Sequence, residues 1–119
     1  MEVHFTARRF RPHKEIRSHA VESIRKLDKY YDGIVRTDVI LSFERTIKSV
    51  KSAEINLHVD GTVLTAKDKS DDFYKSIDLA IEKLERQLAK YKMKLRMKNK
   101  KALRRVKEDS TQPATWVEE

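Results

Sequence analysis

Residues 52–68 read SAEINLHVDGTVLTAKD, and this stretch is the most informative about the fold because its pattern predicts two strands and the turn between them. Apolar and polar residues alternate on both sides of Asp60-Gly61, which predicts strands near residues 52–60 and 62–68. An Asp-Gly pair favours a two-residue hairpin turn, since both turn positions need positive φ. The residues expected to point toward a core are Ala53, Ile55, Leu57, Val59, Leu64 and Ala66.

Downstream of this hairpin the sequence predicts one long helix. Ser70, Asp71 and Asp72 supply side-chain oxygens and negative charge, which favour a helix start over a metal or acid–base pair. Apolar residues then recur every three or four positions over about six turns. They are Tyr74, Ile77, Ile81, Leu84, Leu88, Tyr91 and Leu95. Basic residues occupy every second position from Lys90 to Lys100, but the apolar spacing favours a helix whose end projects into water.

Upstream, the pattern predicts a strand at 2–8, a helix at about 12–32 and a strand at 35–45. Pro12 suits the first turn of that helix, and Gly33 suits the left-handed conformation that closes one. The helix presents an apolar face made of Ile16, Ala20, Ile24, Leu27 and Tyr31. In the strand that follows, one face carries Val39, Leu41 and Phe43.

The resulting order, β-α-β-β-β-α, indicates the α+β class, with a four-stranded sheet and two helices packed on one face. The first helix is expected to join two parallel strands, and the later strands to form an antiparallel meander. Residues 45–51 are interpreted as a polar, basic connection. Past about residue 99 the apolar periodicity is lost, which predicts one folded domain, residues 1–98, and a flexible tail, residues 99–119. Met93 and Met97 lie off the apolar stripe and are expected to be partly exposed.

The composition argues against an enzyme. The 119 residues contain no cysteine, and the glycines, Gly33 and Gly61, do not form a phosphate-binding loop. The four histidines lack metal-ligand spacing, although His4 and His58 are expected on the same polar face of the sheet as a solvated pair. No stretch resembles a signal peptide or a membrane span. We therefore expect a cytoplasmic protein without a metal, a cofactor or a small-molecule substrate.

Positive charge is concentrated in one segment. The net charge of +8 comes from 27 Lys and Arg against 19 Asp and Glu. Residues 1–82 contribute +1, residues 83–107 contribute +11 and residues 108–119 contribute −4. Such a one-sided cluster is typical of a surface that contacts a polyanion.

Within this segment Lys83, Arg86, Lys90 and Lys94 recur at steps of three or four, which predicts one ridge along the helix. A solvated helix face would normally interleave acids, but none follows Glu85 for 22 residues. Lys26 and Lys29 would extend the contact, as would Arg8, Arg9 and Arg11. Lysines that touch phosphates carry little sequence information, so the pattern favours a structured RNA recognised by its shape.

Three stretches resemble the family of ribosome hibernation-promoting factors and ribosome-associated inhibitors. They are DDFYKSIDLAIEKLERQLAKYKMK (71–94), IRSHAVESIRKLDKYYDGI (16–34) and EINLHVDGTVLTA (54–66). The resemblance covers about residues 1–98 and implies a fold similar to double-stranded-RNA-binding domains. It further implies binding to the small ribosomal subunit and its ribosomal RNA, over the mRNA path and the tRNA sites, which inactivates the ribosome under stress or in stationary phase.

By motif position, the resemblance implies that Lys83, Arg86, Lys90 and Lys94 contact ribosomal RNA, and less directly that Lys26 and Lys29 do. Tyr74, Ile77, Leu84 and Leu88 also match the family, but their spacing marks them as core.

Several alternatives stay open. Long family members carry a second, dimerising domain, for which this chain has no room, so a short form that is monomeric when free is expected. Short members either promote ribosome pairing or, when they carry a tail, block it, and residues 99–119 favour the tailed kind. The charge pattern is also compatible with a general double-stranded-RNA binder or with a module that docks an acidic protein.

Overall fold

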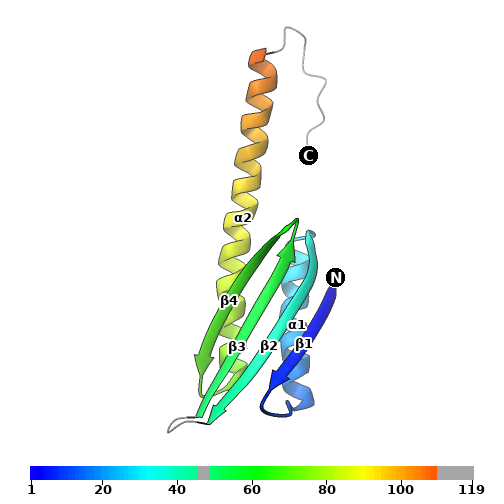
Figure 1. Cartoon of the computed structure of the whole chain (residues 1–119). Helices are drawn as coiled ribbons and strands as arrows, with labels where there is room; N and C mark the ends of the chain where they lie inside the picture. Colours follow the sequence, from blue (N-terminus) through cyan, green and yellow to red (C-terminus); the bar gives the residue numbers. More distant parts are fainter. Residues whose placement is uncertain (46–48, 110–119) are drawn as a thin grey trace. The chain divides into compact units, whose positions relative to one another are not determined.

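A computed structural model of the chain describes residues 1–45 and 49–109. Over these residues the elements follow the predicted order β-α-β-β-β-α, which confirms the α+β class (Figure 1). They are β1 (Glu2–Arg8), α1 (Lys14–Tyr30), β2 (Ile34–Arg45), β3 (Ser49–Val59), β4 (Thr62–Ser70) and α2 (Phe73–Asp109). The chain divides into two compact parts, residues 1–87 and 88–119, and α2 begins in the first part and continues into the second.

The four strands form one sheet in the order β1-β2-β3-β4. Strands β1 and β2 are parallel, whereas β3 pairs antiparallel with both of its neighbours. A parallel pair needs a crossover connection, and α1 supplies it. Within residues 1–87, α1 and the start of α2 lie against the same face of the sheet (Figure 1).

The core lies between that face of the sheet and the helices. The inward residues of β3, namely Ala53, Ile55, Leu57 and Val59, are fully buried, as the alternation predicted. Asp60 and Gly61 have φ values of 43° and 80°, which confirms the predicted turn with positive φ at both positions. The helical part of the core comes from the expected stripes, since Ile16, Ala20, Ile24, Leu27, Ile77, Ile81 and Leu84 are all buried. Leu88, the first residue of the second part, is buried as well.

The predicted core position Tyr74 is wrong by one residue. The Tyr74 side chain is 37% exposed, and its ring lies edge-on to that of His19, with centroids 5.1 Å apart. Phe73 is buried instead and stacks on Phe10 at a centroid distance of 4.5 Å. The apolar spacing does not distinguish the two because they are adjacent aromatic residues at the first turn of the helix.

The end of α1 also differs from the prediction. Helix α1 covers residues 14–30, so Tyr31 lies beyond it with extended backbone, and Gly33 does not have positive φ. The Tyr31 hydroxyl donates a hydrogen bond of 2.7 Å to Asp60 Oδ2 in the hairpin turn. A Cβ at residue 33 would clash with the Tyr31 ring, so glycine provides room for that ring rather than a helix-closing conformation.

The connection between β2 and β3 is shorter than the predicted 45–51, because Ser49 already belongs to β3; residues 46–48 lie outside the described residues. At the other end of the chain, α2 continues to Asp109, so the predicted start of the tail at residue 99 falls within a helix. Residues 110–119, including Trp116, lie outside the described residues, and the flexibility of that segment stays a prediction. Met93 and Met97 are 64% and 63% exposed, as expected.

Candidate nucleic-acid interface

Lys83, the first residue of the predicted ridge, is paired within the protein. Its Nζ atom lies 3.1 Å from Asp68 Oδ1 and 3.0 Å from Asp68 Oδ2, and the Asp68 side chain is only 18% exposed. The contact to Oδ2 is an ion pair without hydrogen-bond geometry, and this buried oxygen has no hydrogen-bond partner in the described part of the chain. Lys83 therefore neutralises a carboxylate that would otherwise be buried without a counter-charge.

Sequence reasoning missed Asp68, although a signal was present. The alternation that directs Leu64 and Ala66 inward also directs Asp68 inward, opposite Ala53. A carboxylate on the core side of a strand requires a cation nearby, and the helix that covers this face begins only a few residues later.

Arg86, Lys90 and Lys94 remain available to an external anion. All three are exposed, and no described carboxylate lies within ion-pair distance of any of them. The Arg86 Nε atom makes one long contact of 3.5 Å to the Glu82 carbonyl oxygen, one turn earlier in the same helix. Lys90 and Lys94 lie on the later part of α2, four residues apart. These three residues are the cations of the predicted ridge that have no described carboxylate partner.

Of the two cations predicted on α1, the structure brings Lys26 close to α2. Lys26 lines a groove of about 360 Å³ together with Leu27, Tyr30 and Glu85, so it faces the acidic residue of the early α2 segment. Lys29 is exposed in the last turn of α1 and does not line this groove. A cation in a last turn stabilises the helix dipole, which gives Lys29 a structural role without any RNA.

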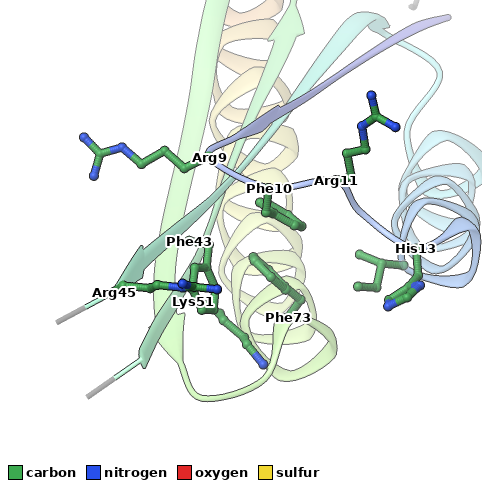
Figure 2. A pocket seen from close by; sticks show the side chains of 9 residues that line it. Arg9, Phe10, Arg11, His13, Phe43, Arg45, Lys51 and Phe73 are labelled. Carbon is green, nitrogen blue, oxygen red and sulfur yellow. The ribbon is translucent and has the colours of Figure 1, made fainter. Parts of the chain in front are cut away.

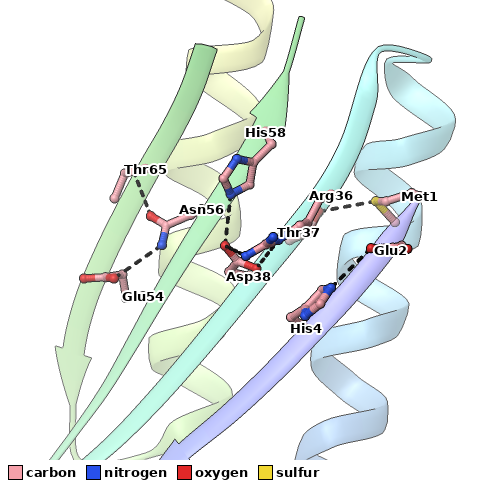
Figure 3. A network of polar contacts seen from close by, with 10 residues as sticks. All are labelled: Met1, Glu2, His4, Arg36, Thr37, Asp38, Glu54, Asn56, His58 and Thr65. Carbon is pink, nitrogen blue, oxygen red and sulfur yellow. Dashed lines mark hydrogen bonds and ion pairs between the residues drawn. The ribbon is translucent and has the colours of Figure 1, made fainter. Parts of the chain in front are cut away.

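On the polar face of the sheet, in contrast, the charges around Asp38 are paired internally (Figure 3). Arg36 Nε donates a hydrogen bond of 2.8 Å to Asp38 Oδ1, and His58 Nε2 lies 2.9 Å from Asp38 Oδ2. The hydrogen bond from Arg36 holds the pKa of Asp38 below its usual value, and His58 adds to the effect against the opposing cost of burial. His4 contacts Glu2 at 3.3 Å, so His4 and His58 each have a carboxylate of their own. Arg36 is therefore less available to an external anion than Arg86, Lys90 and Lys94.

The cations after β1 are separate from the ridge. Arg9 and Arg11 line a pocket that includes Arg45 and Lys51 but neither Lys83 nor Arg86. Across the described residues, no group of three or more His, Asp or Glu side chains is arranged to hold a metal ion. Over the same residues, no helix is both long and apolar enough to cross a membrane.

Residues 3–96 match the family described as sigma 54 modulation protein / S30EA ribosomal protein. The chain is 32% identical over 94 residues to a ribosome hibernation promoting factor from Azotobacter vinelandii, an alignment that covers 79% of this chain and 85% of that protein. It is 34% identical over 88 residues to a ribosome hibernation promotion factor from Lactococcus lactis, covering 74% of this chain but only 48% of that protein. The chain thus spans about half the length of the second relative.

Two solved structures share the fold. A ribosomal subunit interface protein from Coxiella burnetii superposes with a TM-score of 0.70 at 27% identity, covering 78% of this chain and 99% of that one. The N-terminal domain of Thermus thermophilus Protein Y gives a TM-score of 0.67 at 26% identity, covering 76% and 99%. Together with the match over residues 3–96, these similarities show that the chain belongs to the sigma 54 modulation protein / S30EA ribosomal protein family, which includes the ribosome hibernation promoting factors.

Proposed function

We propose that this protein is a ribosome hibernation factor. It binds the small ribosomal subunit over the mRNA path and the tRNA sites, and it inactivates translation under stress or in stationary phase. The observation that carries the proposal is the exposure of Arg86, Lys90 and Lys94 on α2, none of which has a carboxylate within ion-pair distance among the described residues, in a chain whose relatives are named ribosome hibernation promoting factors.

In this proposal Arg86, Lys90 and Lys94 supply the main contacts to ribosomal RNA. An arginine can hold a phosphate through two parallel hydrogen bonds, whereas a lysine acts as a point charge. Contacts of this kind position a protein on RNA without reading its sequence, so the selectivity for one site comes from the shape of the folded RNA. Lys83 would contribute less, because a contact with RNA has to be shared with Asp68.

Sedimentation tests the proposal. The chain is mixed with small ribosomal subunits, and the mixture is separated on a sucrose gradient at low and high salt. We expect the chain to migrate with the subunits at low salt and to leave them at high salt. The variant Arg86→Glu/Lys90→Glu should remain at the top of the gradient at both salt concentrations.

A matched control changes the same amount of charge elsewhere. Lys14 and Lys69 are exposed on α1 and β4, and neither belongs to the predicted site. The variant Lys14→Glu/Lys69→Glu should still migrate with the subunits. The proposed surface is wrong if the α2 variant still binds, or if both variants lose binding equally. A general double-stranded-RNA binder would instead be released from the subunits by an excess of a plain RNA duplex.

The effect on ribosome pairing is a separate question. We propose that the segment 99–119 blocks pairing, so that the full chain leaves single inactive ribosomes. A chain truncated after Lys98 and mixed with whole ribosomes should then give more paired ribosomes on a sucrose gradient than the full chain does. Equal amounts of paired ribosomes with both chains would contradict this role.

A further inference from the structure

A second basic site lies at the end of the sheet where β2 ends and β3 begins. It is a pocket of about 540 Å³, within the range of small-molecule sites, and all of its lining residues belong to residues 1–87 (Figure 2). The segment between β1 and α1 forms one wall, the ends of β2 and β3 form another, and the first residue of α2 closes the base. The pocket shares no residue with the predicted ridge on α2.

The pocket contains a cluster of three phenylalanines. Phe10 stacks on Phe73 with centroids 4.5 Å apart and ring planes 12° apart, and Phe43 lies 6.5 Å from Phe10. Phe73 is buried, whereas Phe10 and Phe43 are only half-buried, so both keep ring surface that a ligand can reach. Flat aromatic surface beside a pocket of this size favours a flat, unsaturated ligand.

Four cations surround these rings. Figure 2 shows Arg9 and Arg11 extending to either side of Phe10, while Arg45 and Lys51 lie beside Phe43. The Arg45 guanidinium carbon is 5.9 Å from the centre of the Phe43 ring, and Lys51 Nζ is 5.8 Å from that of Phe73. Among the described residues, none of the four forms an ion pair with a carboxylate, and no Asp or Glu lines the pocket.

This arrangement is costly for the protein by itself. Like charges repel one another around a partly apolar cluster, and a bound anion would remove that repulsion. Arg9 also has φ of 70°, a left-handed conformation that is unfavourable for a residue with a side chain. Strain of this kind persists where the surrounding structure imposes it and is concentrated at binding sites.

We propose that this pocket binds a nucleotide. The base would lie against the exposed surfaces of Phe10 and Phe43, and the phosphate would be held by Arg45 and Lys51, which lie beside the rings. Both halves of the ligand are needed to account for the pocket, because inorganic phosphate leaves the aromatic surface unused and a neutral ring leaves the cations unpaired. Every nucleotide base has a flat face that can stack on an aromatic side chain, and arginine suits phosphate through bidentate hydrogen bonds.

The nucleotide could be free in solution or part of a single-stranded RNA, and both sources share this chemistry. The inference does not depend on the proposed ribosome binding, since different residues carry the two sites.

Calorimetric titration of the full chain with ATP, in a buffer without divalent cations, tests the proposal. We expect saturable binding at one site. Adenosine, which lacks the phosphates, and inorganic triphosphate, which lacks the base, should each bind at least tenfold more weakly. Equal binding of ATP and inorganic triphosphate would overturn the role of the phenylalanines, and absence of ATP binding would overturn the site.

Variants locate the binding. Arg45→Gln/Lys51→Gln should weaken ATP binding at least tenfold, whereas Arg25→Gln/Lys67→Gln, which removes two exposed cations outside the pocket, should not. Equal affinity of both variants for ATP would place the binding elsewhere. The variant Arg86→Glu/Lys90→Glu should bind ATP like the unmodified chain, so failure of the ribosome proposal and failure of this one can be told apart.

A hexamer of adenylate distinguishes the two sources. A hexamer that binds at least tenfold more tightly than ATP, and loses affinity with Arg45→Gln/Lys51→Gln, identifies an RNA nucleotide as the ligand. Binding no tighter than that of ATP identifies a free nucleotide. If the hexamer binds Arg45→Gln/Lys51→Gln as tightly as the unmodified chain, and ATP does not bind, the proposal is overturned.

Discussion

Tyr31 connects the end of α1 to the hairpin turn between β3 and β4. Its backbone N–H still donates to the Leu27 carbonyl oxygen at 3.0 Å, but its own backbone is extended, and its hydroxyl reaches Asp60. The ring lies where a side chain on residue 33 would otherwise stand. A single residue without a Cβ therefore permits a contact between two segments that are far apart in the sequence.

This contact predicts the effect of Gly33→Ala. The added methyl group would displace the Tyr31 ring and its hydrogen bond to Asp60, so we expect the free energy of unfolding to fall by about 1–3 kcal/mol. Urea unfolding measures the change. In a Tyr31→Ala background the same substitution should cost much less, because the ring is absent.

Gly61→Ala is the matched control. In the described part of the chain a Cβ at residue 61 would meet no atom within 4 Å, but its φ of +80° is unfavourable for alanine. Gly61→Ala should lower the free energy of unfolding by about 1–2 kcal/mol, both in the unmodified chain and in the Tyr31→Ala background. A Gly33→Ala cost that is the same in both backgrounds would refute the steric explanation.

Asp38 predicts a dependence of stability on pH. Its pKa is lowered in the folded state, chiefly by the hydrogen bond from Arg36, so the ionised carboxylate stabilises the fold above its unfolded pKa of about 4. This contribution is lost as the pH falls through the lower, folded-state pKa. We expect Asp38→Asn to reduce the free energy of unfolding by about 1 kcal/mol at neutral pH.

The difference in the free energy of unfolding between Asp38→Asn and the unmodified chain should become smaller well below pH 4. Urea unfolding at neutral pH and at a pH well below 4 measures this change. Glu22→Gln, at an exposed position of α1, is the control for removing one carboxylate. An effect of Asp38→Asn that stays constant over this pH range would show that the ionised carboxylate is not what stabilises the fold.

Among the elements, α2 is capped at its N-terminus by Asp72, a residue of the short loop after β4. Asp72 Oδ1 accepts a hydrogen bond of 3.0 Å from the Tyr74 N–H, and the Asp72 carbonyl oxygen accepts the Ser76 N–H at 3.0 Å. Ser76 is fully buried, and its hydroxyl donates a hydrogen bond of 2.7 Å to the Lys51 carbonyl oxygen. The first turn of α2 is thereby attached to the start of β3, beside the phenylalanine cluster.

The cap predicts that Asp72→Ala destabilises the fold by about 1 kcal/mol. Asp71→Ala removes the same charge one position earlier and should cost only a few tenths of a kcal/mol through the helix dipole. Urea unfolding of both variants measures the difference. Equal effects would mean that charge near the helix start, rather than the hydrogen bond from Asp72, stabilises this end of α2.

Across the whole molecule, the cations differ in whether a carboxylate of the protein already pairs with them. Arg36, Asp38 and His58 satisfy one another on the sheet, whereas Arg86, Lys90 and Lys94 have no carboxylate within reach among the described residues. Lys83 is intermediate in its availability, because it is exposed but already forms an ion pair with Asp68. This division ranks the cations by their availability to RNA.

The ranking predicts unequal salt dependence. The logarithm of the association constant for the small subunit should fall linearly with the logarithm of the salt concentration. Arg86→Gln should reduce the slope by about one, because it removes one phosphate contact. Lys83→Gln should reduce it by less. Binding measured over a series of salt concentrations decides between them, and an equal or larger reduction for Lys83→Gln would contradict the ranking.

Local sequence patterns were enough to predict the order of the elements, the inward residues of β3, the Asp60-Gly61 turn and the concentration of charge after residue 82. These features depend on local periodicity and turn chemistry, which are properties of neighbouring residues. Three features depend on the folded arrangement instead: the pairing of Lys83 with Asp68, the space that Gly33 leaves for Tyr31, and the pocket between Phe10, Phe43 and Phe73. Each of these joins residues from different elements, and a spacing rule within one element contains no information about such distances.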